Sequence, residues 1–363
     1  MIIIRKSHII IKTIANFLVD LPAASNLSFI WNFGSLLGLC IFIQIITGFL
    51  LTIHYSSNID TAFSCIAHTL RDVNIGWCLR SMHANGASIL FLCIYIHIAR
   101  GIYFKSFLLN EVWLFGVLIY ILAISTAFTG YLLPWGQIRF WGATVITNIF
   151  SAIPYFGNIT VIWLWGGFAV RNPTLTRFFA LHFILPFVIL FIIILHLVFL
   201  HLTGSRNPLG INSNFLKTPF HLHFTTKDTI GFMLLLIFLC FLVFFNPNLL
   251  GDPENFIPAN PLVTPTHIIP EWYFLWAYAI LRSIPNKLGG VIIIAAAIII
   301  LFFLPVLWKK NNFSILFFQV RLWFLIVIFI LLTWIGRCPV EPPYDWIGLI
   351  FTIFYILLFF IDL

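Results

Sequence analysis

The sequence predicts an all-α, polytopic membrane protein with eight transmembrane helices, of which the first four form a four-helix bundle. Of the 363 residues, 61% are hydrophobic and only 8% are charged, whereas soluble domains are about 45–50% apolar and about 25% charged. The mean hydropathy of +1.07 agrees with this contrast. These values exclude a water-soluble globular protein, so the net charge of +8 is interpreted through membrane topology and not through nucleic-acid binding.

Eight apolar stretches reach or approach the roughly 20 residues that a helix needs to cross a bilayer. They are near-continuous and lack the alternation of barrel strands, so each helix can satisfy its own backbone polar groups. Tryptophan and tyrosine stand at several of their ends, as they do at membrane interfaces. The predicted spans are residues 33–55, 76–103, 113–133, 178–202, 228–245, 288–308, 317–335 and 346–361, the last being the shortest.

The segment before the first span combines isoleucines with Arg5, Lys6 and Lys12. A cleaved signal peptide is one interpretation of this segment. Because Lys12 and Asp20 interrupt its apolar region, we favour a short amphipathic helix on the membrane surface. The chain is therefore predicted to have three regions: an N-terminal surface segment (1–32), the four-helix bundle (33–210) and a C-terminal four-helix region (211–363).

An even number of spans places both termini on one side of the membrane. That side carries 11 lysine and arginine residues, against 8 on the opposite side, and the excess assigns it to the negative, cytoplasm-like face. Residues 134–177 and 246–287 then form long connections on the other side, rich in proline, glycine and tryptophan. Long ordered loops of this kind are usually functional, so we expect a site there.

Four histidines lie inside two of the predicted spans, where ionisable residues mark candidate functional sites. His83 and His97 are 14 residues apart in the second span, and His182 and His196 are 14 apart in the fourth. Fourteen residues fall about 40° short of four helical turns, so both rings of a pair face one side, about 21 Å apart along the axis. Two facing helices would make two bis-histidine sites, and the alternative is interhelical hydrogen bonding.

The ligand types favour iron in haem over zinc. Two imidazoles per site, without carboxylates or thiolates nearby, match six-coordinate haem iron better than tetrahedral zinc. The six cysteines show no Cys-x-x-Cys spacing, so covalent haem attachment is not expected. Glycine lets a flat ring approach the backbone closely, although helix packing is an alternative use. The first and third spans each carry two glycines 14 residues apart, namely Gly34, Gly48, Gly116 and Gly130, and we predict two non-covalent haem b groups.

Two arginines flank the histidine pair of the second span. Arg80 lies one turn before His83, and Arg100 lies one turn after His97. Each points away from the middle of the pair, where haem propionates would lie, and arginine can bind a carboxylate through two hydrogen bonds. Snorkelling to the membrane interface is the alternative. We predict that both arginines bind propionates.

Six motifs cover nearly the whole chain and carry a resemblance to a known family. They are residues 31–34 (Trp-Asn-Phe-Gly), 83–86 (His-Ala-Asn-Gly), 130–137 (Gly-Tyr-Leu-Leu-Pro-Trp-Gly-Gln), 141–146 (Trp-Gly-Ala-Thr-Val-Ile), 201–210 and 270–273 (Pro-Glu-Trp-Tyr). With them the chain resembles the cytochrome b family, in the mitochondrial form found in respiratory ubiquinol:cytochrome c oxidoreductase (complex III). Chloroplast-type relatives are split after the fourth span, and their second histidine pair is one residue wider. This chain is continuous with equal spacings, so it resembles the mitochondrial or the proteobacterial form. The lack of a transit peptide fits synthesis inside the organelle.

The resemblance implies a specific residue set for two haems and two quinone sites. His83 and His182 would bind a low-potential haem near the outer face, and His97 and His196 a high-potential haem near the matrix. The quinol-oxidation site would comprise Phe128, Tyr131, Gly142, Ile146, Pro270, Glu271 and Tyr273. The quinone-reduction site would comprise Trp31, Asn32, Ser35, His201, Ser205, Phe220, Lys227 and Asp228.

The resemblance also implies the reaction and the setting. In the Q cycle, quinol would give one electron to a Rieske iron–sulfur protein and the other to the low-potential haem, and the second electron would reach the other haem and reduce quinone. The implied partners are the Rieske protein, a c-type cytochrome, other complex III subunits and a second copy of the complex, with no nucleic acid. The implied location is the mitochondrial inner membrane, with both termini on the matrix side.

Physical chemistry supports proton-transfer roles at both quinone sites. Glu271 follows Pro270 in an apolar, proline-framed loop, where desolvation is expected to raise its pKa and make it a proton carrier; an acid in the first turn of a short helix is the alternative. His201 and Asp228 lie at the termini-side ends of two spans. A base and an acid there can supply two protons to a reduced quinone, or they are plain interfacial residues.

Two positions depart from the family pattern, and two other functions stay open. Arg139 stands where a small residue is usual, so an unexpected charge with no predicted partner is expected near the quinol-oxidation site, and His223 replaces a usual aromatic. A transporter with a histidine proton relay would lack a haem spectrum. A two-haem anchor of a dehydrogenase would keep haem reduction by quinol after Glu271→Gln.

Overall fold

The structure is a computed structural model that describes residues 6–308 and 315–360. Within these residues, seven helices are long and apolar enough to cross a membrane. They are α3 (Phe33–Thr52), α5 (Gly76–Tyr103), α6 (Asn110–Leu132), α9 (Asn172–Thr203), α10 (Phe220–Phe245), α12 (Lys287–Leu307) and α13 (Ile315–Arg337). The predicted all-α, polytopic fold class is therefore confirmed. Four charged residues that contribute to the net charge lie outside the described residues, namely Arg5, Lys309, Lys310 and Asp362.

The predicted eighth span is a shorter helix than the others. α14 (Tyr344–Leu357) has 14 residues, about 21 Å of helix, whereas the hydrocarbon core of a bilayer is about 30 Å thick. By length alone it does not qualify as a span, and residue 361, the predicted end, lies outside the described residues. α14 packs against α13 and α11 (Leu275–Ser283) beside the long helices.

Two spans begin earlier than the hydropathy of the sequence predicts. α9 starts six residues before position 178, because Pro173 occupies the first turn and Arg171 and Thr174 form a capping box, both of which favour helix initiation. α10 starts at Phe220 instead of residue 228. Its first turns carry polar residues, which masked the helix in a hydropathy-based analysis.

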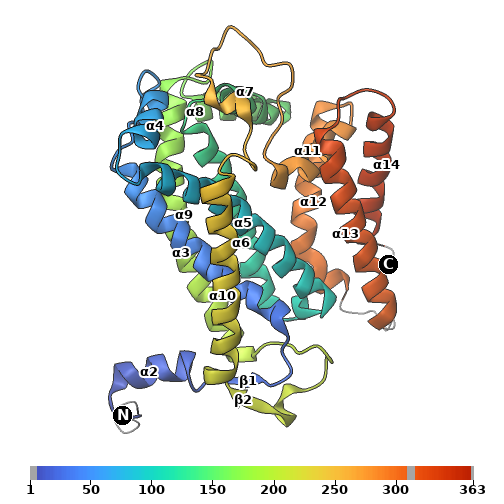
Figure 1. Cartoon of the computed structure of the whole chain (residues 1–363). Helices are drawn as coiled ribbons and strands as arrows, with labels where there is room; N and C mark the ends of the chain where they lie inside the picture. The colour runs from blue at the N-terminus through green and yellow to red at the C-terminus, as the bar shows by residue number, and fades with distance from the viewer. Residues whose placement is uncertain (1–5, 309–314, 361–363) are drawn as a thin grey trace.

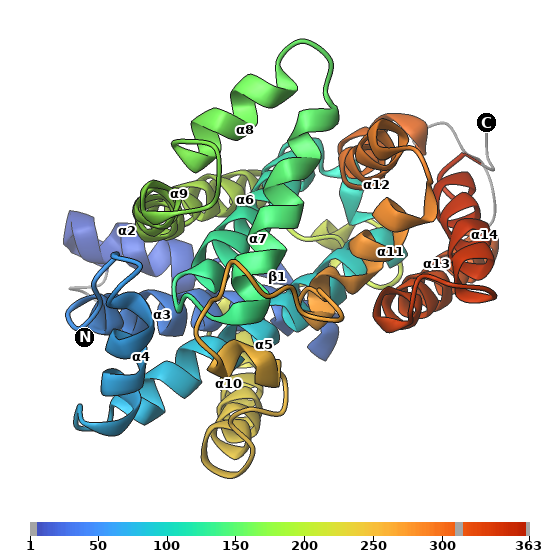
Figure 2. The same cartoon turned by 90° about the horizontal axis from the view of Figure 1, so that it is seen from above.

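The long helices form two groups that lie side by side. α3 packs against α5, and α6 packs against α9, which together make the four-helix bundle. α12 and α13 form a second group with α11 and α14, and α12 contacts α6 while α13 contacts α5. Figure 2 shows the two groups from above, with α10 beside α5 at the edge of the bundle. The Trp113 indole joins the groups by donating a hydrogen bond to the Leu301 carbonyl, at 2.6 Å.

One end of the bundle carries the N-terminal segment. α2 (Ile9–Leu18) is exposed except at Ala15 and the half-buried Phe17, and it lies across the direction of the long helices (Figure 1). It is followed by β1 (Pro22–Ala24), which pairs antiparallel with β2 (Lys217–Pro219), just before α10. This small sheet was not predicted, because its two strands are far apart in the sequence. A short helix is present where one was predicted, and its place on the membrane surface stays a prediction.

The opposite end carries the two long connections. The first contains α7 (Gln137–Ile149) and α8 (Gly157–Trp165), and the second contains the short helices η5 (Pro253–Phe256) and η6 (Trp272–Phe274) before α11. α4 (Ala62–Arg71) lies at the same end (Figure 1). Gln137 fastens the connections to each other: its Nε2 donates to the Val263 carbonyl at 2.5 Å, and its Oε1 accepts from the Asn260 amide at 2.6 Å.

Candidate functional site

The four intramembrane histidines form two pairs across the bundle. His83 and His97 belong to α5, and His182 and His196 belong to α9. The ring centroids of His83 and His182 are 6.1 Å apart, and those of His97 and His196 are 6.4 Å apart. The equal 14-residue spacings predict two sites on facing helices, and the structure brings together the two pairs that the resemblance implies.

The ring separations fit one metal ion between the two imidazoles of each pair. A ring nitrogen lies about 1.1 Å from the centroid, and a metal–imidazole bond is about 2.0–2.1 Å, so two imidazoles on opposite sides of one metal have centroids about 6.3 Å apart. In the described part of the chain, no group of three or more His, Cys, Asp or Glu side chains is arranged to hold a metal. A two-imidazole set without further ligands suits haem iron and not structural zinc.

Hydrogen bonds at Nδ1 orient the rings of His83 and His182, which we call the upper pair. The Nδ1 of His182 lies 2.8 Å from the Thr126 carbonyl, and the Nδ1 of His83 lies 3.0 Å from Thr47 Oγ1. A histidine that donates from Nδ1 keeps the Nε2 lone pair for a metal, and such partners fix the tautomer of metal-bound histidines. Sequence analysis missed both threonines, although Thr47 directly precedes Gly48 and Thr126 lies one turn before Gly130.

Each of the four predicted glycines faces one histidine ring. A Cβ added to Gly48 would lie 2.9 Å from His83, one on Gly116 would lie 3.3 Å from His196, and one on Gly34 would lie 3.4 Å from His97. At Gly130 the added atom would overlap the His182 ring. The glycines therefore leave room for the imidazoles at two levels of the bundle. A side chain at Gly48 or Gly130 would displace the facing ring, whereas one at Gly34 or Gly116 would meet the ring in closer but bearable contact.

The two arginines lie beside the histidine pairs. An Nη of Arg100 is 3.2 Å from the Nδ1 of His97, and its guanidinium lies 5.5 Å from the Trp31 ring. The Nε of Arg100 is buried, with no hydrogen-bond partner in the described part of the chain. A buried, unsatisfied N–H suits an anionic group such as a propionate. Arg80 is half-buried and interacts electrostatically with His83 and Tyr131.

A cavity of about 50 Å³ lies between α6, α7 and the second connection. All residues predicted for the quinol-oxidation site line it except Tyr273, and the lining also includes Phe274, Tyr278 and Arg139. Typical ligand pockets have volumes of about 300 Å³ or more, so a quinol ring would require side chains here to move. Phe274 and Tyr278 were missed because they follow the recognised motif 270–273.

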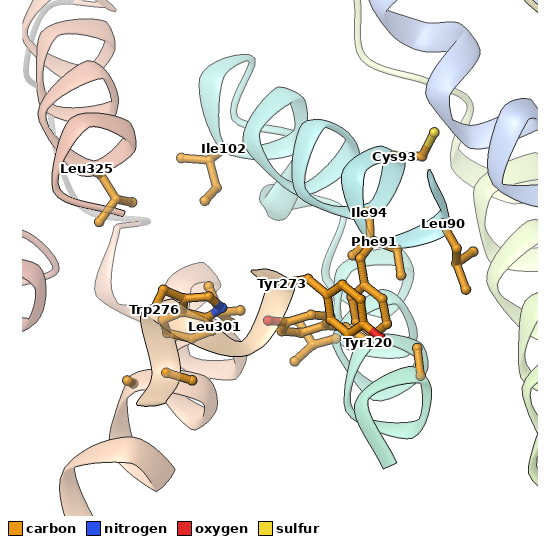
Figure 3. Close-up of a cluster of buried hydrophobic side chains, with 14 of the residues drawn as sticks. Leu90, Phe91, Cys93, Ile94, Ile102, Tyr120, Tyr273, Trp276, Leu301 and Leu325 are labelled. Carbon is orange, nitrogen blue, oxygen red and sulfur yellow. The ribbon is translucent and has the colours of Figure 1, made fainter. Parts of the chain in front are cut away.

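Tyr273 lies behind this cavity, in the core. Its ring stacks on Phe91 at 4.2 Å with an interplanar angle of 4°, and its backbone carbonyl accepts a hydrogen bond from Tyr95. Figure 3 shows Tyr273 among Phe91 and Tyr120. Burial raises the pKa of its phenol well above the ordinary range. Its position favours a packing role, although the resemblance implies that it belongs to the quinol-oxidation site.

Arg139 and Glu271 form a buried ion pair in the cavity. An Nη of Arg139 donates a hydrogen bond to Oε1 of Glu271. Arg139 is 8% exposed and Glu271 is 6% exposed, so the pair is out of water. The guanidinium also lies 4.5 Å from the centre of the Tyr131 ring, within range of a cation–π contact. Arg139, which had no predicted partner, thus pairs with the carboxylate that was singled out as a proton carrier.

Four residues of the predicted quinone-reduction site come together near β1 and the start of α10. Ser35 Oγ donates to Asp228 Oδ1 at 2.7 Å, and the Asn32 side chain donates to the Lys227 carbonyl at 2.7 Å. Trp31, another residue of the predicted site, directly precedes Asn32 in the sequence. Lys227 Nζ donates to the Leu27 carbonyl at 2.9 Å. The first and fifth long helices thus share a polar cluster at the end of the bundle that carries α2.

The other members of that predicted site contact different partners. The His201 ring stacks on Phe17 at 3.9 Å, and its Nδ1 and Nε2 face the carbonyls of Leu197 and Phe17. His201 is therefore covered by the last turn of α2, a contact that was not predicted from the sequence. Phe220 packs on Phe224, Ser205 follows α9, and His223 is exposed with its ring edge against Phe224.

Comparisons with known proteins agree with this arrangement. Residues 18–204 match the family model described as Cytochrome b/b6/petB, and residues 258–356 match the one described as Cytochrome b(C-terminal)/b6/petD. Among solved structures, a chain described as "Hyperthermophilic respiratory Complex III" is similar, with 34% sequence identity and a TM-score of 0.90. The similarity covers 100% of this chain and 98% of that chain.

Proposed function

Because this chain belongs to the cytochrome b family, we propose that it is the catalytic subunit of a ubiquinol:cytochrome c oxidoreductase and transfers electrons across the membrane in the Q cycle. Ubiquinol is oxidised at the cavity between α7 and the second connection, and ubiquinone is reduced at the polar cluster near α2. The difference in proton uptake and release between these two faces contributes to a proton gradient.

Two b-type haems are held by the four histidines. The observation that carries the proposal is the pair of ring separations, 6.1 Å for His83 and His182 and 6.4 Å for His97 and His196, each ring facing a glycine. When bound, the haems supply one-electron transfer between the two quinone sites. Arg80 binds a propionate of the haem held by His83 and His182, and Arg100 binds a propionate of the haem held by His97 and His196.

The chain's own residues position the substrates and move the protons. At the quinol site, Tyr131, Phe128, Gly142, Ile146 and Pro270 enclose the ring and exclude water, and a Glu271 carboxylate oxygen takes a proton from the quinol hydroxyl. At the quinone site, Asp228 donates a proton from its carboxyl group, held by Ser35, while Trp31, Asn32, Ser205, Phe220 and Lys227 line the site. His201 is the second proton source, after its ring leaves the Phe17 carbonyl.

The setting follows from the same assignment. The partners are a Rieske iron–sulfur protein as acceptor of the first electron, a c-type cytochrome, other complex III subunits and a second copy of the complex. The chain is a multi-pass protein of the mitochondrial inner membrane. With α14 taken as an eighth, short crossing, both termini lie on the matrix side, in line with 11 basic residues on the termini side against 8 opposite. Region 33–210 holds both haems, and region 211–363 completes the quinol site.

A redox titration of the haem spectrum in native membranes tests this assignment. We expect two components of different potential, of which His182→Leu removes one and His196→Leu removes the other. His68→Leu is the matched control, because His68 is exposed on α4 and pairs with Asp72, and it should retain both. A single component in the unaltered chain, or both components in the His182 variant, would contradict the assignment.

A further inference from the structure

The quinol cavity contains two opposite charges in otherwise apolar or aromatic surroundings. Arg139 comes from α7 and Glu271 from the segment before η6, 132 positions apart in the chain. The remaining lining is aliphatic or aromatic, with Phe128, Ile146, Pro270 and Phe274 among its members. The two charges therefore depend on each other, because a lone charge is expensive in such a site.

A carboxylate accepts a proton only while it is ionised. Burial among apolar groups favours the protonated form, whereas a hydrogen-bonded guanidinium favours the ionised form. Burial lowers the pKa of Arg139, and its interactions with Tyr131, Tyr273 and Asp252 oppose that shift. Guanidinium stays charged in proteins, so it remains a permanent counter-ion to Glu271.

We propose that Arg139 is a positioning residue of the quinol site, which holds Glu271 ionised and turned into the cavity so that it can accept the quinol proton. The inference rests on the proposed quinol-oxidation function and deepens it. The step on Glu271 is a proton transfer alone: one quinol O–H bond breaks, its electron pair stays on the quinol oxygen, and an O–H bond forms on a Glu271 carboxylate oxygen. The second hydroxyl proton and the two electrons leave in separate steps of the proposed quinol oxidation. The protonated Glu271 no longer balances the guanidinium, and this imbalance favours release of the proton.

The geometry also fixes how the guanidinium is held. Its central carbon lies over the Tyr131 ring, 4.5 Å from the ring centroid, while one Nη reaches Glu271. Lysine would keep the charge but has no planar fork to share between a ring and a carboxylate. The other charged or titratable groups around the pair are Tyr131 on α6, Tyr273 on η6, Tyr278 on α11, Asp252 before η5 and Arg80 on α5.

The experiment measures the pH dependence of quinol oxidation by the assembled complex, with a soluble short-chain ubiquinol as the probe. In the unaltered complex, activity falls as the pH drops through the titration of Glu271. Arg139→Gln removes the counter-ion, so this acidic limb moves to higher pH, by about one unit or more. Arg139→Lys gives a smaller displacement in the same direction. Arg71→Gln, an exposed arginine on α4, is the matched control and leaves the profile in place.

A double substitution and an infrared measurement complete the test. Glu271→Gln abolishes the acidic limb of the pH profile, and adding Arg139→Gln to this variant leaves the profile unchanged. Infrared spectra of the purified complex at neutral pH show a protonated-carboxyl band in the Arg139→Gln variant that is absent when Glu271→Gln is added. An Arg139→Gln profile that coincides with that of the unaltered complex, or no such band, overturns the inference. If the unaltered complex does not oxidise quinol, the proposed function is refuted. The infrared measurement then still tests whether Arg139 keeps Glu271 ionised.

Discussion

At the scale of single residues, the environments of His83 and His182 explain the orientation of their rings. On the α9 side of the upper pair, the Thr126 carbonyl faces one edge of the His182 ring, and the bare Cα of Gly130 faces the ring itself. On the α5 side, Thr47 and Gly48 occupy the equivalent places around His83. A ring held on two sides is already ordered, so it loses little conformational entropy when it binds a metal.

The tightest of these contacts gives a prediction for Gly130→Ala. The added methyl overlaps the His182 ring, and overpacking of this kind costs about 1–3 kcal/mol. We expect the variant to lose the component of the haem spectrum assigned to His83 and His182 and to keep the other. Gly38→Ala on α3 is the control, since its added Cβ meets no atom within 4 Å. Two unchanged components in the Gly130 variant would show that the ring position does not matter.

At the scale of elements, the quinol cavity depends on how two distant connections are joined. α7 supplies Arg139 and Gly142, whereas the second connection supplies Pro270 and Glu271. Besides the side chain of Gln137, the backbone amide of Gln137 donates to the Ile257 carbonyl at 2.9 Å. The cavity is thus assembled from loops, and its geometry depends on the hydrogen bonds that join them.

Gln137→Ala tests this dependence. The substitution removes the bonds to Val263 and Asn260, worth about 1–3 kcal/mol together, and leaves the histidine pairs untouched. We expect faster proteolysis within residues 246–270 and a KM for quinol that rises up to about tenfold, since 1.4 kcal/mol corresponds to a factor of ten. The haem spectrum should not change. Asn148→Ala, exposed on the same helix, controls for the helix itself. A normal KM with normal proteolysis would refute the role of Gln137.

The same elements show what sequence could and could not predict. Helix periodicity places His83 and His97 on one face because that relation is local, and the similarity to family members confirms the fold class and the family. The ion pair of Arg139 with Glu271 joins residues 132 positions apart, and β1 pairs with a strand nearly 200 residues away. Such contacts depend on how the helices pack, which periodicity does not determine. The roles of the site residues stay predictions, and Tyr273 shows that a motif residue can pack in the core.

At the scale of the whole molecule, the two ends of the bundle differ in structure and in charge. α2 and the small sheet lie at one end, and α4, α7 and α8 lie at the other (Figure 1). Lys12 and Lys217 are exposed at the first end, and Lys287 is exposed where α12 begins at the second. A bilayer separates these ends, because exposed apolar side chains cover the long helices between them.

This sidedness predicts which lysines a membrane-impermeant amine reagent reaches. In vesicles whose outer surface is the positive side of the membrane, we expect mass spectrometry to find label on Lys287 and none on Lys12 or Lys217; inverted vesicles should give the opposite pattern. Membranes opened with detergent are the control. Only lysines that are labelled in the opened membranes are scored, because a lysine covered by another subunit would be unlabelled on either side. The physical reason is that basic residues are retained on the negative side during insertion, and the excess of 11 over 8 is small. Label on Lys12 and Lys217 in the first preparation would reverse the orientation, and the proposed quinol-oxidation site would then face the negative side of the membrane.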